Sequence, residues 1–309
     1  MKKKILIAVD CSIYSSQSLD YIAKIFANDQ DISFYIINCV TSGGGIIESS
    51  ADQANSLIPG CEGQGKKLGP GEDYLHKARE KLIRRGIATE RITTETVISG
   101  YNFAATIQLT AQKNLVDAIL IGRRGLGYLS SVLMGSVSGT LVQDCHEVPV
   151  WLIDGEVKAA NILVPVDGGL PSMLAADHLA HIIEGRSDIQ IFLFHCSQLL
   201  HKSVLCEPKE FYGHWDQTWC DRYLSDGKCL FDGPTQLLIE AGIPKEQITV
   251  LPTAMDLDQA HAILIQARKN DCGTIVIGRR GQGITKGILG GVSDRAAKHA
   301  QDMALWIVG

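Results

Sequence analysis

The sequence has no excess of positive charge and no long apolar run. Its 309 residues carry 29 lysines and arginines against 34 aspartates and glutamates, a formal net charge of −5 at pH 7. Charge-driven binding to nucleic acid or an anionic membrane needs a basic surface, so the composition favours neither partner. The first apolar run ends at Asp10 and is too short for a signal-peptide core or a membrane span. We therefore expect a cytoplasmic protein with no nucleic-acid and no membrane partner.

The nine cysteines are odd in number and form no Cys-x-x-Cys pair. In a reducing cytoplasm we expect them to be free thiols. Residues 197–234 hold cysteines and histidines, which are the residue types that bind zinc, but their spacing matches no standard site. Free thiols among packed aromatics are the preferred interpretation, and a metal site stays open. Cys39 and Cys196 would sense redox state only if exposed and acidic, and we expect buried core residues instead.

The sequence repeats itself once. Ile5–Asp10 (ILIAVD) reappears as Ile162–Asp167 (ILVPVD), and Gly122–Gly127 (GRRGLG) reappears as Gly278–Gly283 (GRRGQG). The offsets are 157 and 156 residues, a period that indicates two whole domains rather than a solenoid. We expect the domains at residues 1–154 and 159–309, joined by a short polar linker.

Each copy alternates short apolar runs with segments of helical spacing. In the first copy we expect strands at residues 4–9, 32–40, 91–98, 117–121 and 148–153, and helices at 15–28, 73–85, 102–114 and 136–145. This alternation predicts an α/β fold, a parallel sheet with helices on both faces. Two long segments interrupt it. We interpret the glycine-rich residues 41–72 as a mobile lid and residues 197–234 as an ordered, partly helical insertion.

Candidate ligand-binding residues follow the first and fourth strands. No Gly-x-Gly-x-x-Gly follows the first strand, which argues against a dinucleotide-binding dehydrogenase. Gly122 and Gly125 follow the fourth strand, and Gly135-Ser136 opens a helix after nine further residues. Glycines admit phosphate close to the backbone, and a helix N-terminus offers N–H donors. The alternative interpretation is two ordinary turns, with Ser12 and Ser15 only capping a helix.

These motifs resemble those of ATP-binding universal stress proteins. The matching residues are Gly122-x2-Gly125-x9-Gly135-Ser136 and the start Asp10-x-Ser12-x-x-Ser15, and the resemblance covers nearly the whole chain, twice over. It implies two tandem doubly wound domains, each a five-stranded parallel sheet in the order 3-2-1-4-5 with helices on both faces. It also implies adenosine contacts from Ala8, Val9 and Asp10, an adenine pocket lined by Val40, and ribose and phosphate contacts from Gly122, Gly125, Gly135, Ser136 and Val137.

Two further side chains are expected to act on the phosphates, Ser138 as a hydroxyl donor and Arg123 as a cation. Together with Arg124, Arg123 suits a group that assists phosphoryl transfer. No general base or metal-holding carboxylate pair is evident nearby, so we prefer a solvated basic pair that tunes phosphate affinity. Mg²⁺ or Mn²⁺ bridging the phosphates is left open, without a dedicated carboxylate pair to hold it.

The second copy departs from the motif. Only eight residues separate Gly281 from Gly290, and Gly291 stands in place of Ser136. Gly169 replaces Ser12, and Ser197 replaces Val40. Asp294, in the first turn of the expected helix, would repel an incoming phosphate. We expect weak or no ATP binding in the second copy.

The sequence thus favours an ATP-binding regulatory protein of the stress-response type with slow or no hydrolysis. A phosphoryl- or adenylyl-transferring enzyme and a non-nucleotide interaction scaffold are the alternatives. Trp151 and Trp306 recur in the last strand of each copy. Because the family's last strand pairs between domains, we expect these residues to support an intramolecular pseudo-dimer, and a further homodimer stays open.

Overall fold

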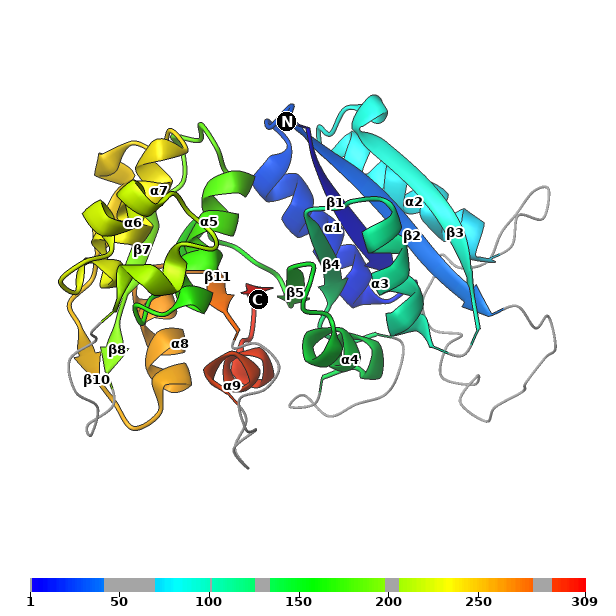
Figure 1. Ribbon diagram of the computed structural model, residues 1–309. Helices are drawn as coiled ribbons and strands as arrows, with labels where there is room; N and C mark the ends of the chain where they lie inside the picture. The colour runs from blue at the N-terminus through cyan, green and yellow to red at the C-terminus, as the bar shows by residue number, and fades with distance from the viewer. Residues whose placement is uncertain (1, 42–69, 101, 126–133, 198–205, 280–290) are drawn as a thin grey trace. The chain divides into compact units, whose positions relative to one another are not determined.

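The computed structural model describes residues 2–41, 70–100, 102–125, 134–197, 206–279 and 291–309. Contacts divide the chain into two compact units, residues 1–148 and 149–309. Figure 1 shows strands alternating with helices in both units. Within the described residues, no helix combines the length and the apolar character needed to cross a bilayer.

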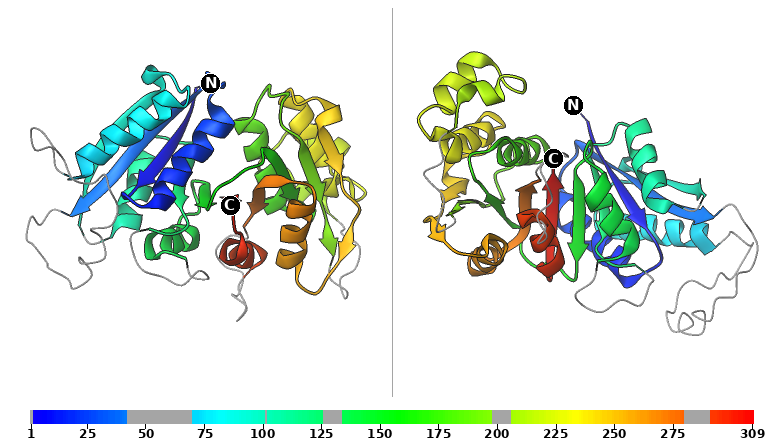
Figure 2. Two further views of the ribbon diagram at one scale, coloured as in Figure 1. Left: turned by 180° about the vertical axis from the view of Figure 1, so that it is seen from behind. Right: turned by 60° about the horizontal axis from the view of Figure 1, so that its bottom comes forward.

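The first unit is built on four parallel strands in the order β3-β2-β1-β4. Helices α1 and α2 pack together on one face, and α3 and α4 pack together on the other (Figure 2). The strands β1 and β4 are apolar and almost fully buried, as expected of strands covered on both faces. The elements are β1 (Lys3–Val9), α1 (Ile13–Phe26), β2 (Ile32–Thr41), α2 (Pro70–Arg84), β3 (Ile92–Ser99), α3 (Phe103–Lys113), β4 (Ala118–Gly122) and α4 (Ser136–Asp144).

The second unit contains the sheet β5-β12-β11-β6-β7-β9 and a two-stranded sheet of β8 and β10. Its own five strands follow the predicted order 3-2-1-4-5, and helices α5 and α7 pack together, as do α8 and α9. The elements are β5 (Val150–Asp154), β6 (Asn161–Pro165), α5 (Leu170–Ile182), β7 (Ile191–Phe194), β8 (Cys196–Ser197), α6 (Gln217–Tyr223), α7 (Asp232–Glu240), β9 (Ile248–Val250), β10 (Ala254–Met255), α8 (Gln259–Lys269), β11 (Cys272–Gly278), α9 (Val292–His299) and β12 (Met303–Val308).

These arrangements confirm the predicted fold class, and they add one detail. Strand β5 comes from the first sequence copy, but its contacts assign it to the second unit because it pairs antiparallel with β12. Trp151 lies directly opposite Trp306 in this pair, and the two buried rings stack with centroids 3.7 Å apart. The Nε1–H of Trp151 donates to Nε2 of His178 at 3.2 Å. The two tryptophans lie on paired strands, and the intramolecular pseudo-dimer that they are expected to support stays a prediction.

The insertion of the second copy is ordered and partly helical over its described part, as predicted. Short helices at Pro208–Phe211, Gln217–Tyr223 and Lys228–Leu230 lead into α7. They bury Phe211, Cys220 and Leu224 against Met173 and Ala176 of α5. The expected lid of the first copy falls almost entirely on residues 42–69, outside the described residues.

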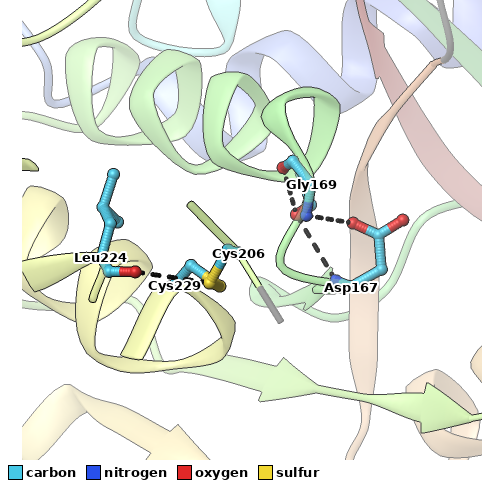
Figure 3. The surroundings of a disulfide bond; sticks show 6 residues. Asp167, Gly169, Cys206, Leu224 and Cys229 are labelled. Atoms are coloured by element: carbon cyan, nitrogen blue, oxygen red, sulfur yellow. Dashed lines mark hydrogen bonds between the residues drawn. A yellow bond between two sulfur atoms is a disulfide. The ribbon is translucent and has the colours of Figure 1, made fainter. Parts of the chain in front are cut away.

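The prediction that all cysteines are free thiols is wrong for one pair. Cys206 and Cys229 form a disulfide within the insertion (Figure 3). The two residues are 23 positions apart and are brought together by the turn of chain around α6. Figure 3 also shows the turn from Asp167 to Gly169, which leads into α5, the helix that the insertion covers. The metal site left open has no support in the described residues, where no cluster of histidine, cysteine and carboxylate side chains is found.

Candidate functional site

The two glycine segments of the first copy, residues 122–125 and 135–138, meet at the carboxyl ends of β1 and β4. These strands are neighbours in the sheet, and the strand order reverses between them, which is where open α/β sheets bind ligands. The N–H of Gly135 donates to the carbonyl of Arg123 at 2.9 Å, so the segment after β4 is joined directly to the start of α4. The predicted convergence of residues 122–125 and 135–138 is therefore present.

Asp10 occupies the turn after β1, and its carboxylate is held in place. Oδ1 accepts from the hydroxyl groups of Ser12 at 2.5 Å and Ser15 at 2.7 Å. Ser12 also caps α1 by accepting from the Ser15 N–H, so the capping interpretation and the site interpretation hold together. The other oxygen, Oδ2, faces Gly125, where an added Cβ would lie only 2.4 Å away. Gly125 is needed because the carboxylate approaches its backbone.

The predicted adenosine and adenine contacts lie near the carboxyl ends of β1 and β2. Ala8 and Val9 are buried in β1, and Val40 is half-buried near the end of β2. The sequence missed two neighbours, Asn38 and Gly71. The Asn38 amide donates to the Val9 carbonyl at 2.8 Å, and a Cβ on Gly71 would lie 2.5 Å from Asn38 Oδ1 and 3.5 Å from Val40 Cγ1. The first turn of α2 therefore covers the end of β2, beside the residue expected to contact adenine.

At the start of α4, Gly135 is the N-cap residue and Ser136 is exposed in the first turn. Within the described residues no side chain caps this helix, so its first N–H groups remain directed at the site. Val137 is half-buried behind them. This is the geometry that favours an anion at a helix N-terminus.

Two predicted roles need correction. Ser138 is buried and its hydroxyl lies 2.7 Å from the Arg123 carbonyl oxygen, to which it donates, so Ser138 joins the two glycine segments instead of facing a phosphate. Arg123 is only 1% exposed and is not part of a solvated basic pair. The equivalent Arg279 of the second copy is also buried, at 8% exposed, which indicates a packing role common to both copies. Arg124, in contrast, is half-buried.

The corresponding region of the second copy is built differently. Oδ1 of Asp167 accepts from the backbone N–H of Gly169 at 3.0 Å, as Oδ1 of Asp10 does from the Ser12 N–H at 3.2 Å, but Gly169 has no hydroxyl group to add the second bond that Ser12 donates. His195 replaces Asn38 and keeps the same bond, from Nδ1 to the Val166 carbonyl at 2.7 Å. At the start of α9, the Asp294 carboxylate accepts from the Gly291 N–H at 3.2 Å. The predicted spacing from Gly281 to Gly290 lies outside the described residues.

Cys196 on β8 is buried as expected, whereas Cys39 on β2 is half-buried, and desolvation makes both thiols poor nucleophiles. It raises the pKa of Cys39 to about 11, and it raises the pKa of Cys196, with the nearby Asp256 carboxylate adding to the effect. Neither thiol is acidic, which argues against the redox-sensing alternative. A separate groove lies between α2 and β3, lined on one side by Glu72, His76 and Arg79 and on the other by Thr94 and Thr96. It is not formed by the residues of the glycine segments.

Fold and site together define a doubly wound α/β protein with glycine segments at the reversal of strand order. The model of the universal stress protein family matches residues 1–154 and again residues 159–305. The chain belongs to the universal stress protein family and contains two of its domains in tandem.

Solved structures with this fold span the whole chain. A universal stress protein from Archaeoglobus fulgidus DSM 4304 is 16% identical with a TM-score of 0.66, over 100% of this chain and 98% of that one. A functionally unknown protein from Pseudomonas aeruginosa PAO1 is 13% identical with a TM-score of 0.55, over 99% and 92%. At these identities the similarity shows the fold alone. A comparison with curated proteins finds no match.

Proposed function

We propose that the first copy binds ATP at the carboxyl ends of β1 and β4, and that the protein is a regulator of the stress-response type with slow or no hydrolysis. One observation carries the proposal. The N–H of Gly135 is bonded to Arg123, and the uncapped start of α4 is thereby fixed beside Gly122 and Gly125. This places a helix N-terminus and a glycine-lined backbone on the same short segment, as a polyphosphate cradle requires.

We propose for the remaining residues the roles that the family resemblance implies. Ala8, Val9 and Asp10 would contact adenosine, Val40 would contact adenine, and Gly122, Gly125, Gly135, Ser136 and Val137 would bind ribose and phosphates through backbone groups and the Ser136 hydroxyl. Arg123 would support the cradle through its carbonyl rather than contact the nucleotide. Mg²⁺ or Mn²⁺ would be held mainly by the phosphates, because the Asp10 carboxylate is already engaged by two hydroxyl groups.

We propose that the second copy does not bind ATP. The first N–H of its α9 helix, at Gly291, is occupied by the Asp294 carboxylate, and that negative charge stands where the phosphates would lie. The Asp294 side chain stabilises its own helix in the same way that a phosphate would. A phosphate entering this copy would meet a carboxylate at the N-cap, whereas the N-cap N–H of α4, at Gly135, is bonded to a neutral carbonyl.

Residues 1–154 and 159–309 are proposed as the functional domains, with the second serving as the pseudo-symmetric partner of the first. We propose the cytoplasm as the location, although the disulfide in the insertion is not what a reducing compartment favours. A homodimer of the whole chain is a further proposal, and gel filtration with light scattering tests it directly.

Calorimetric titration with ATP tests the function. We expect the wild-type protein to bind about one ATP per chain, and Gly135→Asp and Ser136→Asp to abolish binding, because each places a carboxylate at the start of α4. Gly290→Asp is the matched control in the second copy and should leave binding unchanged. Equal loss from both copies would contradict the asymmetry.

The same samples separate the alternatives. Nucleotide released by denaturing the purified protein should be adenine nucleotide, and incubation with ATP should form little ADP. Rapid ADP formation would support a phosphoryl-transferring enzyme, and release of AMP or pyrophosphate an adenylyl-transferring one. Absence of bound nucleotide together with absence of binding heat would support the scaffold.

A further inference from the structure

Arg124 lies in the first glycine segment, between Gly122 and Gly125, and is held against Tyr14. Its guanidinium carbon is 5.0 Å from the centroid of the Tyr14 ring, and Nη1 donates to the Tyr14 hydroxyl oxygen at 3.4 Å. Tyr14 is in the first turn of α1, two residues beyond the Ser12 cap. The arginine side chain therefore lies where α1 begins and the glycine segment passes.

We infer that Arg124 binds the phosphates of the nucleotide and that Tyr14 positions it for this role. The inference rests on the proposed ATP site, and it assigns to Arg124 alone, with Tyr14 as its support, the phosphate affinity that the sequence suggested for the Arg123–Arg124 pair. A guanidinium presents five N–H donors in one plane and matches phosphate oxygens in a bidentate manner, so it can contact Tyr14 and a phosphate together. Stacking on an aromatic ring restricts a flexible side chain before the ligand arrives.

The charge distribution of the site calls for such a cation. The Asp10 carboxylate faces the backbone of Gly125, the residue that follows Arg124, and a phosphate placed there would be repelled by it. The preceding arginine, Arg123, is 1% exposed and its side chain is enclosed by protein. Of the two adjacent arginines, the half-buried Arg124 is the one whose side chain reaches the surface at this segment.

The second copy carries a natural change at the positioning residue. Gly122 lies against Tyr14, since an added Cβ would be 3.0 Å from Tyr14 Cβ, and Gly278 lies in the same way against Pro171. Pro171 is thus the structural equivalent of Tyr14. Proline has no aromatic face and no hydroxyl group. The second copy therefore has no counterpart of the Tyr14 side chain that holds Arg124 in the first copy. This difference agrees with the phosphate-binding asymmetry between the copies.

The test compares ATP with adenosine, which has no phosphates, by calorimetry on four variants. We expect Arg124→Gln to weaken ATP binding about ten- to a hundredfold, the loss typical of a charged hydrogen bond, and to leave adenosine affinity unchanged. Tyr14→Leu removes the ring and should weaken ATP binding about two- to fivefold, whereas Tyr14→Phe keeps the ring and should bind ATP like the wild type. Arg85→Gln, an arginine 61% exposed just after α2 and ion-paired with Asp20, is the control for the loss of one positive charge.

The outcomes distinguish this inference from the proposed function. If the wild type binds ATP and Arg124→Gln binds it equally well, the role of Arg124 is refuted and the ATP site stands. If Arg124→Gln weakens adenosine and ATP to the same extent, Arg124 supports the fold of the site and the phosphate contact is refuted. If the wild type does not bind ATP, both fail. Circular dichroism and thermal midpoints of the variants should match the wild type.

Discussion

Removing the Cys206–Cys229 disulfide should destabilise the second unit by a measurable amount. The bond closes a loop across 23 residues, and in the chain-entropy model such a cross-link lowers the entropy of the unfolded chain by about 11 cal/mol/K. This corresponds to about 3 kcal/mol at room temperature. The closed loop contains α6 and contributes Phe211, Cys220 and Leu224 to the core over α5, so the loss should appear in the packing of this unit.

Tryptophan fluorescence is a suitable assay because all four tryptophans lie in the second unit. Trp151 and Trp306 form the stacked pair of β5 and β12, and Trp215 and Trp219 pack against the insertion core. With a urea dependence of about 2 kcal/mol/M, a loss of 3 kcal/mol moves the unfolding midpoint down by about 1.5 M. We expect this shift on adding a dithiol reductant, and also in the double variant Cys206→Ser, Cys229→Ser.

The double variant is also the control, because its midpoint should no longer respond to reductant. Coincident midpoints for the oxidised and reduced wild type would refute the reasoning, since the bond would then restrict nothing in the unfolded chain. Mass spectrometry of peptides prepared without reductant identifies the pairing independently. A peptide in which Cys206 is joined to Cys220 in place of Cys229 would refute the assignment itself.

The other predictions concern Gly125 and Cys39. Gly125→Ala places a Cβ 2.4 Å from an Asp10 oxygen whose carboxylate is fixed by two hydroxyl groups, and it should lower stability by about 1–3 kcal/mol in thermal or urea unfolding. Gly139→Ala in α4, where an added Cβ meets nothing within 4 Å, should be neutral or stabilising, and similar losses in both variants would contradict the steric argument. A pKa of about 11 lowers the thiolate fraction of Cys39 near neutral pH roughly 300-fold relative to a free thiol, and the greater nucleophilicity of a basic thiolate offsets about tenfold. Iodoacetamide should therefore alkylate Cys39 about thirtyfold more slowly than glutathione at pH 7.5, and an equal rate by peptide mass spectrometry would contradict the raised pKa.

The fold could be predicted because its signals are local and occur twice. Continuous apolar runs such as Ala118–Ile121 indicate strands buried on both faces, and the repeat fixes the two copies. The convergence of Asp10 with Gly122 and Gly125 also followed, because neighbouring parallel strands bring their carboxyl ends to one edge of the sheet. The pairing of β5 with β12 was expected only from the family resemblance, because the two strands lie about 150 residues apart and no local signal joins them.

What the sequence missed depends on side-chain direction and on distant packing. Arg123 and Arg124 are identical neighbours, and only the path of the backbone after β4 decides that one is buried and the other is stacked on Tyr14. The pairing of Cys206 with Cys229, with Cys220 left free in the same core, depends on how the insertion folds against α5. No spacing rule distinguishes these cysteines.

The differences between the copies separate packing from proposed ligand binding. Features common to both copies serve packing: the buried arginines Arg123 and Arg279, the bond from the end of the second strand to the first, and the stacked Trp151 and Trp306. Three of the positions that differ lie at the carboxyl edge of the sheet, where Ser12 is buried, Tyr14 is half-buried and Ser136 is exposed. Ser12 becomes Gly169, Tyr14 becomes Pro171 and Ser136 becomes Gly291, and each change removes a hydroxyl group without exposing core.

A domain that has lost its ligand and is retained as a structural partner is expected to change in this way, because core residues are still required and the ligand donors are not. We propose that the β5–β12 pair is the reason for retaining the second copy. Strand β5 pairs with β12 and contributes Trp151 to the core of the second unit, so removing the second copy would expose an apolar strand of the first. We propose that this pairing keeps the second copy in the chain whether or not that copy binds a ligand.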